Sequence, residues 1–349
     1  MLHLALHHRL QARAARALLS LPDRALLAMS GGRPFIRDGL VLDPQVQLLL
    51  TLQRRLKRPL LHQLSVAGAR RELEVNCHIM APAARPLADV RDDTFPAPAG
   101  KLPVRIYRPH GVPRPAPALV YFHGGGFVTG SLDSHDPVCR LLADEARCIV
   151  LAVDYRMGPE HRFPSAPDDA LAAFRHVASH TGPLGLDPVR LAIGGDSAGG
   201  NLSAVVALAT RSDPVRPAFQ LLIYPATDLT MSFPSIETMG HGLFLERATM
   251  DWFLGHYLRN DDDRRDPRAS PWLEPDVRGA PPACIVTAGF DPLRDEGEAY
   301  AHKLRDAGVA VSLERHTALF HGFINVCGGL SHALPPVLEM AAAVRRALA

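Results

Sequence analysis

The chain has 349 residues, of which 47% are hydrophobic and 21% are charged, and its formal net charge is +2. This is the composition of a globular protein of about two structural units, so wholesale disorder is excluded. The balanced charge gives no reason to expect nucleic acid as a partner. Because the sequence contains no run of about 18 apolar residues, neither a membrane-spanning helix nor stable membrane insertion is expected.

The cysteines and residues 1–32 indicate in which compartment of the cell the protein is expected. Five cysteines are scattered along the chain without a C-x-x-C pair, which indicates neither a metal site nor a disulfide framework. Residues 1–32 are arginine-rich and amphipathic, but they lack a continuous apolar segment followed by a cleavage site. A secretory signal is therefore not expected, and the predicted location is the cytoplasm.

Taken in chain order, residues 1–75 show helical patterns, with the first strand-like alternation at 73–75. Proline-rich stretches at 95–98 and 109–117 bracket a short predicted strand at 104–107. Beyond this point, short apolar runs alternate with amphipathic helical patterns. The predicted strands are 118–122, 148–153, 189–193, 219–224, 283–288 and 309–314. The predicted helices are 136–145, 167–179, 199–210 and 293–307. This alternation predicts an α/β fold, with a mostly parallel central sheet and helices on both faces.

One interval breaks the alternation. Residues 226–280 hold a predicted helix at 246–258 and a charge run at 261–266. The interval is too long for a plain connection, so it is interpreted as an inserted cap or lid. The charge run is expected to be a solvated loop.

The segment Gly195-Asp196-Ser197-Ala198-Gly199 matches G-x-S-x-G. It follows an apolar run and opens a predicted helix, which is the context of a nucleophile elbow: a tight strand-to-helix turn that holds the serine hydroxyl out. Glycines suit such a turn because neighbouring side chains would collide. A glycine-rich turn with a helix-capping serine is the alternative interpretation.

A second glycine-rich segment, His123-Gly124-Gly125-Gly126, directly follows the predicted strand 118–122. Backbone N–H groups of consecutive glycines can point into a cleft, as an oxyanion hole requires. A phosphate-cradling loop is the alternative, but no G-x-G-x-x-G or G-K-[ST] pattern lies nearby. His123 is expected to brace the loop rather than to react.

A nucleophilic serine needs a base, and the base needs an orienting carboxylate. Asp291 and His321 follow the predicted strands 283–288 and 309–314. In a parallel sheet, both residues should therefore lie with Ser197 at the carboxyl edge, where open α/β sheets bind ligands. The chain order Ser, Asp, His is that of α/β-hydrolases. Competing residues lie close by in the sequence: His302, His316, Asp295 and Glu296. The two acids fall in the first turn of the next predicted helix, where acids commonly stabilise the N-terminus.

Five separated segments now agree with one known family. They are YFHGGGFVTG at 121–130, DYRMGPEHRFPSAPDD at 154–169, GGDSAGGNL at 194–202, GFDPLRDEGEAYAHKL at 289–304 and HGF at 321–323. The sequence resembles the hormone-sensitive-lipase-like, bacterial family IV esterases of the α/β-hydrolase superfamily, over roughly residues 75–349. The form GDSAG is similar to the subgroup with Asp before the nucleophile.

The resemblance implies a role for each matching position. Ser197 would be the nucleophile, His321 the general base and acid, and Asp291 its orienter. The N–H groups of Gly125, Gly126 and Ala198 would form the oxyanion hole, with Gly124 shaping the loop. Glu160 matches a family loop that supports the site rather than reacting. Gly158, in the same loop, stands where the family usually has alanine, which could loosen the turn.

The resemblance also implies an organisation and a reaction. Residues 1–75 and the insertion 226–280 would form a helical cap on a catalytic domain spanning 76–349. The expected enzyme is a serine carboxylesterase that cleaves short- to medium-chain acyl esters through an acyl-enzyme, without metal or organic cofactor. Its expected partner is a small-molecule ester, with a homodimer possible. The candidate cap residues for the acyl pocket are Phe35, Met231, Phe233, Leu243 and Phe244.

Two alternatives stay open at this point. The same triad could serve an amidase, a formamidase or an acetyl-ester hydrolase, and nothing in the sequence separates these from a carboxylesterase. The fold could also carry a non-catalytic ligand-binding protein, such as the plant gibberellin-receptor type. Those proteins typically lack the catalytic histidine, which is present here.

Overall fold

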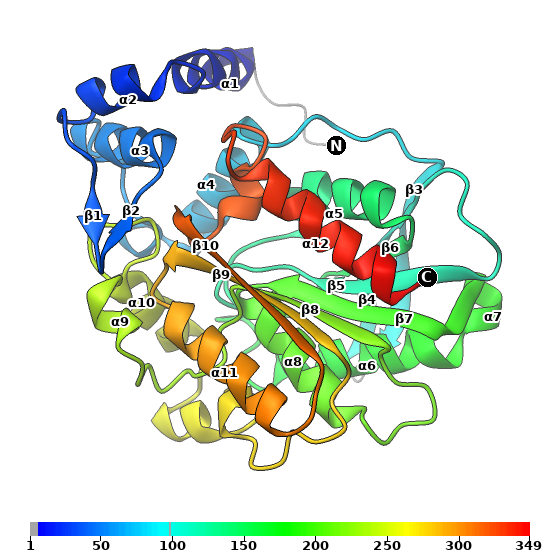
Figure 1. Ribbon diagram of the computed structural model, residues 1–349. Coiled ribbons are helices and arrows are strands. Elements are labelled where there is room, and N and C mark those ends of the chain that lie inside the picture. Colours follow the sequence, from blue (N-terminus) through cyan, green and yellow to red (C-terminus); the bar gives the residue numbers. More distant parts are fainter. Residues whose placement is uncertain (1–5, 98) are drawn as a thin grey trace.

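A computed structural model describes residues 6–97 and 99–349; residues 1–5 of the expected N-terminal helix and Pro98 of the proline-rich stretch lie outside the described residues. The centre of the molecule is an eight-stranded sheet (Figure 1). Its strands are β3 (Asp89–Ala97), β4 (Gly100–Arg108), β5 (Ala116–Phe122), β6 (Ile149–Val153), β7 (Leu186–Asp196), β8 (Phe219–Ile223), β9 (Ala283–Phe290) and β10 (Val311–Phe320). Their spatial order is β10-β9-β8-β7-β5-β6-β4-β3.

The strands from β10 to β6 run parallel, and only β4 and β3 are antiparallel additions at one edge. β5, β6, β8 and β9 are buried along their whole length, as expected of parallel strands covered on both faces. The predicted mostly parallel α/β sheet is therefore confirmed.

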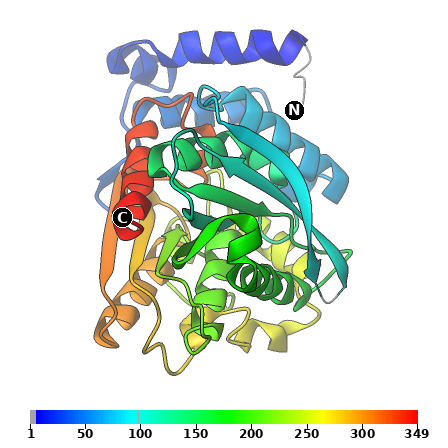
Figure 2. The same ribbon diagram turned by 90° about the vertical axis from the view of Figure 1, so that its right-hand side faces the viewer.

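Helices cover both faces of the sheet (Figure 2). α5 (Leu132–Ala146) and α12 (Leu334–Ala347) pack on one face, while α6 (Ser165–Ser179), α8 (Ala198–Ala209) and α11 (Arg294–Asp306) pack on the other. The short α7 (Thr181–Leu184) precedes β7. No helix within the described ranges is long and apolar enough to cross a bilayer.

From residue 6 onward, the N-terminal segment forms four α-helices, a 3₁₀ turn, η1 (Leu61–Gln63), and a small hairpin. The helices are α1 (Leu6–Leu19), α2 (Asp23–Met29), α3 (Pro44–Arg55) and α4 (Val66–Ile79), and the hairpin pairs β1 (Ile36–Arg37) with β2 (Leu40–Val41). The strand-like alternation predicted at 73–75 is wrong, because these residues lie in the middle of α4. Ser65 caps this helix by accepting a hydrogen bond from the Gly68 N–H, and the long pattern that starts there outweighs three alternating residues.

Further elements differ from the sequence-based expectation. The hairpin of β1 and β2 was not predicted, because only helical patterns were expected there. β3 was not predicted; it holds Pro96, which is tolerated because β3 is an edge strand. β10 runs to Phe320, six residues beyond the predicted end at 314. The C-terminal helix α12 was also not predicted.

The interval 226–280 contains the predicted helix as α10 (Arg247–Tyr257), together with the short α9 (Ser235–Thr238). The charge run forms a 3₁₀ turn, η2 (Asp261–Arg265), and a second 3₁₀ turn, η3 (Pro271–Leu273), follows. The prediction of a solvated loop fails for Asp263, which is buried and accepts hydrogen bonds from the Arg259 guanidinium.

Candidate active site

The three residues of the predicted triad share one structural position. Ser197 directly follows β7, Asp291 directly follows β9, and His321 directly follows β10. These strands run parallel, so their carboxyl ends meet at one edge of the sheet. In Figure 1 the arrowheads of β9 and β10 point toward the N-terminal helices and α10.

The side chains of the three residues form a continuous chain of hydrogen bonds. His321 Nδ1 donates to Asp291 Oδ2 at 2.8 Å, and His321 Nε2 lies 3.0 Å from Ser197 Oγ. The second carboxylate oxygen of Asp291 accepts the backbone N–H of Leu293 at 2.8 Å, which fixes the plane of the carboxylate. Asp291 is fully buried, whereas Ser197 and His321 keep a small exposed fraction. This is the geometry in which an imidazole can take a proton from a hydroxyl.

Ser197 sits on a strained turn. Its φ of 55° and ψ of −116° are unfavourable for a residue with a side chain, and such strain costs of order 1–3 kcal/mol. The surrounding backbone holds the conformation: the Ser197 N–H donates to the Ile223 carbonyl at 2.8 Å. A Cβ on Gly195 or Gly199 would collide with the carbonyl oxygen of Phe122, so the tight approach of β5 requires glycine at both positions.

The glycine loop follows β5 and lies beside this turn. Among the described residues, the backbone N–H groups of Gly125, Gly126 and Ala198 have no hydrogen-bond acceptor, and all three residues line the same cavity as Ser197. Gly125 has a φ of +124°, and a Cβ there would collide with the Thr129 carbonyl. Three unpaired donors beside a hydroxyl make an anion-binding position.

Asp196 ties the glycine loop to the serine turn. Its Oδ1 accepts the Gly124 N–H at 2.9 Å and the Tyr121 hydroxyl at 2.8 Å, and His135 Nε2 lies 3.3 Å from the same oxygen. Burial acts to raise the pKa of Asp196, but the His135 charge and the hydrogen bonds from Tyr121 and Gly124 hold that pKa below its ordinary value. The ionised Asp196 carboxylate therefore holds the glycine loop and the serine turn in fixed positions relative to each other.

His123 lies behind the loop rather than in the cavity. Its Nδ1 is 2.9 Å from the Gly124 carbonyl, and its own carbonyl accepts the Tyr155 hydroxyl at 2.7 Å. Burial lowers the pKa of His123 to about 4, so its imidazole is neutral at ordinary pH. These contacts fit the bracing role expected for this residue.

The competing residues point elsewhere. Asp295 accepts the Ser235 N–H at 2.9 Å, and Glu296 accepts the N–H groups of Thr227 and Asp228, so both acids fasten the start of the insertion. His302 lies in α11 and His316 lies in β10, and neither side chain lines the cavity.

Glu160 lies outside the cavity and links the N-terminal segment to the site. Both of its carboxylate oxygens accept hydrogen bonds from Arg70 of α4, at 2.8 and 2.7 Å. The same guanidinium donates to the carbonyls of Val128 and Gly158. A Cβ on Gly158 would lie 2.6 Å from the His256 carbonyl at the end of α10, so the alanine usual in the family would require a shift here. The looser turn stays a prediction.

The cavity has a volume of about 560 Å³ and is lined mainly by apolar side chains. Its walls come from α1, α3 and α4 on one side and from α10 on the other. Of the candidate cap residues, Met231 and Phe244 line it, but three do not. Phe35 instead packs on Phe290, Phe233 packs on Trp272, and Leu243 belongs to the core.

Sequence reasoning missed several residues that shape the site. Phe253 of α10 packs so closely on the loop that a Cβ on Gly126 would enter its ring. Cys77 of α4 lines the cavity, although nothing but the helical period around it could have indicated this. The position of Tyr121 could have been inferred from the sequence. It precedes Phe122 in the predicted strand that leads into the glycine loop, and because side chains alternate along a strand, the two residues point to opposite faces of the sheet.

Several known proteins resemble this chain in sequence and structure. A model of the alpha/beta hydrolase fold family matches residues 119–325. The carboxylic ester hydrolase LipN of Mycobacterium tuberculosis is 44% identical, over 88% of this chain and 83% of that protein. The ethyl acetate hydrolase of Pseudomonas putida is 42% identical, over 76% of this chain and 85% of that protein.

Solved structures give the same result. The ester hydrolase EH1AB1 from the metagenome of Lake Arreo, in complex with a bipyridine phosphonate derivative, superposes with a TM-score of 0.84 at 42% identity, covering 87% of this chain and 98% of that chain. The hyperthermophilic esterase of Pyrobaculum calidifontis gives a TM-score of 0.82 at 39% identity, covering 88% and 99%.

The chain belongs to the alpha/beta hydrolase fold family, in its hormone-sensitive-lipase-like branch. Its enzyme class is carboxylic ester hydrolase. The resemblance to hormone-sensitive-lipase-like esterases and the expected enzyme class are thereby confirmed, while the subgroup indicated by GDSAG stays a prediction.

Proposed function

We propose that this enzyme hydrolyses short- to medium-chain acyl esters of small molecules through an acyl-enzyme on Ser197. The observation that carries the proposal is the hydrogen-bonded chain from Ser197 through His321 to the buried Asp291, in which Ser197 and His321 line an apolar cavity.

In this mechanism, His321 Nε2 takes the proton of Ser197 while Oγ attacks the ester carbonyl. The bond from carbonyl carbon to alkoxy oxygen then breaks, and the alcohol leaves with the proton from His321. Water attacks the acyl-enzyme with His321 again as base, which releases the acid and restores the serine. Asp291 holds the Nδ1–H tautomer and stabilises the imidazolium that forms twice in each cycle.

We assign the oxyanion hole to the N–H groups of Gly125, Gly126 and Ala198. The support is that all three donors are unpaired within the described ranges and border the cavity beside Ser197. The helix that starts at Ala198 also places the positive end of its dipole at this point. No step of this mechanism calls for a metal or an organic cofactor.

Gly125→Ala is expected to lower kcat by about 100-fold or more. The added methyl group collides with the Thr129 carbonyl and must displace the loop, which removes at least one oxyanion donor. Steady-state kinetics on p-nitrophenyl butyrate measure the effect, with Gly182→Ala as control because a Cβ at Gly182 meets no neighbour. If Gly125→Ala retained wild-type kcat, the loop could not supply the donors.

We further propose that residues 1–75 and 226–280 act as the cap over the catalytic domain at 76–349. Since α4 crosses residue 75, the natural end of the first cap part is the end of that helix, at Ile79. The two parts are joined by a hydrogen bond of 2.8 Å between His62 and Thr249, and by guanidinium bonds from Arg37 and Arg54 to carbonyls of residues 238–242.

The helical cap supports the proposed preference for short- to medium-chain acyl groups. The cavity walls come from helices on both sides, so an acyl chain must fit inside the protein instead of lying along an open face. We therefore expect a higher kcat/KM on p-nitrophenyl butyrate than on the palmitate ester. A series of p-nitrophenyl esters of increasing length measures this preference, and higher efficiency on palmitate would refute it.

Experiment decides between carboxylesterase activity and the alternative activities of the same triad. A panel of esters, anilides and formamides separates a carboxylesterase from an amidase or formamidase, and acetylated sugars test the acetyl-ester hydrolase. We keep the cytoplasm as the proposed compartment, because all five cysteines are buried and unpaired. A homodimer through the exposed edge of the sheet also stays a proposal.

A further inference from the structure

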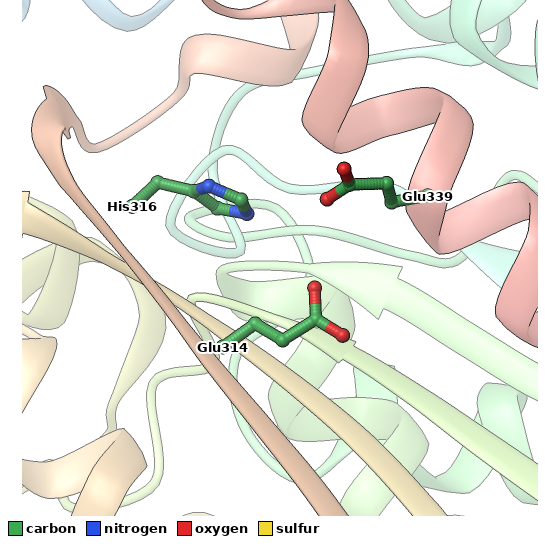
Figure 3. Close-up of side chains that lie close together, drawn as sticks. All are labelled: Glu314, His316 and Glu339. Carbon is green, nitrogen blue, oxygen red and sulfur yellow. The ribbon is translucent and has the colours of Figure 1, made fainter.

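A second cluster of chemically capable side chains lies away from the proposed active site. Glu314 and His316 stand two residues apart on β10, the edge strand of the sheet, so they point to the same face. Glu339 reaches toward them from α12, which covers that face. Figure 3 shows the three side chains around one gap, with a ring nitrogen of His316 turned toward both carboxyl groups.

The distances between the three side chains suit a shared metal ion better than direct hydrogen bonds between them. One donor atom from each residue lies within 4.8 Å of the other two. Nevertheless, within residues 6–97 and 99–349 no hydrogen bond or ion pair joins the imidazole to either carboxylate. His316 Nε2 is buried and has no hydrogen-bond partner, which is costly for a polar atom. A cation in the gap would satisfy it.

The two carboxylates of the cluster also lack ion-pair partners among the described residues. No arginine or lysine of the described chain forms an ion pair with Glu314 or Glu339; the one polar contact is a 3.3 Å hydrogen bond from Ser312 to Glu314. Arg315, between the two strand residues, points to the opposite face and pairs with Glu298. On α12, the positions three and four residues from Glu339 carry no charge.

The environment of the His316 imidazole suits a metal ligand. Burial lowers the pKa of His316, although the charges of Glu314 and Glu339 oppose this. The ring also packs edge-on against Phe323 at 5.8 Å between centroids, which limits its rotation.

We propose that Glu314, His316 and Glu339 bind one divalent first-row transition ion, of which Zn²⁺ is the representative, with water completing the coordination. One imidazole and two carboxylates are ligands that Zn²⁺ accepts at about 2.0–2.2 Å, so the side chains need to close by about an ångström or less. Mg²⁺ and Ca²⁺ prefer oxygen-only sets. The ion joins α12 to the sheet edge, so its effect is on stability and not on ester cleavage.

Titration calorimetry on metal-stripped enzyme tests the proposal. ZnCl₂ should bind at one equivalent, and saturation at about 100 times Kd should raise the melting temperature by about 4 °C. Glu339→Gln, an exposed change that leaves folding intact, should weaken Zn²⁺ binding by at least about 100-fold, since even the partners of direct ligands are commonly worth 10–100-fold. His316→Asn should do the same.

Two controls separate this site from chance binding by other histidines and acids. His180→Asn removes one ring of the stacked surface pair His176–His180, and Asp306→Asn removes an exposed acid at the end of α11; both should bind Zn²⁺ as the wild type does. The proposal fails if wild-type enzyme takes up no Zn²⁺, or if either ligand variant retains wild-type affinity. Binding of Ca²⁺ as tight as that of Zn²⁺ would overturn the assigned class of metal.

Discussion

Ser197→Ala is expected to lower kcat on p-nitrophenyl butyrate by about 10⁶-fold, leaving only the residual rate that binding and the anion-binding position supply. The reason is that no acyl-enzyme can form without the hydroxyl, which lies 3.0 Å from His321 Nε2. Folding should be unaffected, because removing the hydroxyl leaves the backbone bonds of the turn in place.

A serine six residues further along the chain provides the control. Ser203 lies in the same helix, α8, and its hydroxyl bonds to the Gly199 carbonyl at 2.8 Å, a contact confined to the helix. Ser203→Ala should keep kcat within a few-fold of wild type. If Ser197→Ala retained substantial turnover in a preparation free of contaminating esterase, the nucleophile would have to be another residue.

Asp291→Asn is expected to lower kcat by up to about 10⁴-fold. The carboxylate serves two donors at once, the Leu293 N–H and the His321 Nδ1–H, both at 2.8 Å. An asparagine has one acceptor oxygen, so if it serves Leu293, its NH₂ faces His321 and favours the tautomer with the proton on Nε2. That nitrogen can then no longer accept the proton of Ser197.

Asp295→Asn is the matched comparison, because this acid lies four residues away and bonds to Ser235 instead of His321. We expect a reduction in kcat of less than about tenfold, since the variant loses part of an anchor for the insertion and no member of the triad. Steady-state kinetics on both variants decide between the acids. A silent Asp291→Asn together with an inactive Asp295→Asn would make the triad assignment wrong.

The parts of the fold that local pattern controls could be predicted from the sequence. The inner strands are largely apolar runs. The motifs around Ser197 and Asp291 come directly after two of them, and the motif around His321 follows the edge strand β10, so the topology of a parallel sheet was enough to bring these residues to one edge. The strand ends were set too early because polar residues such as Arg315 and Thr317 interrupt the apolar pattern, although β10 continues to Phe320.

The remainder depends on tertiary contacts that no local pattern encodes. β3 is a strand only because it pairs with β4 along its whole length, and its proline is tolerated at the sheet edge. The cavity walls depend on how α4 and α10 meet, so only two of the five candidate cap residues were placed correctly. Likewise, Asp196 could be read as part of a motif, but its bond to Gly124 requires two loops to meet in space.

Covalent labelling with an alkyl p-nitrophenyl phosphonate tests the central claim most directly. The phosphorus mimics the ester carbonyl, so attack by an activated serine leaves a stable phosphonyl group while p-nitrophenolate departs. Mass spectrometry of the digested enzyme should find one phosphonyl group, on Ser197, with loss of activity in proportion and no label in Ser197→Ala. Folded wild-type enzyme that stays unlabelled, or that carries the label elsewhere while esterase activity is lost, would contradict the account.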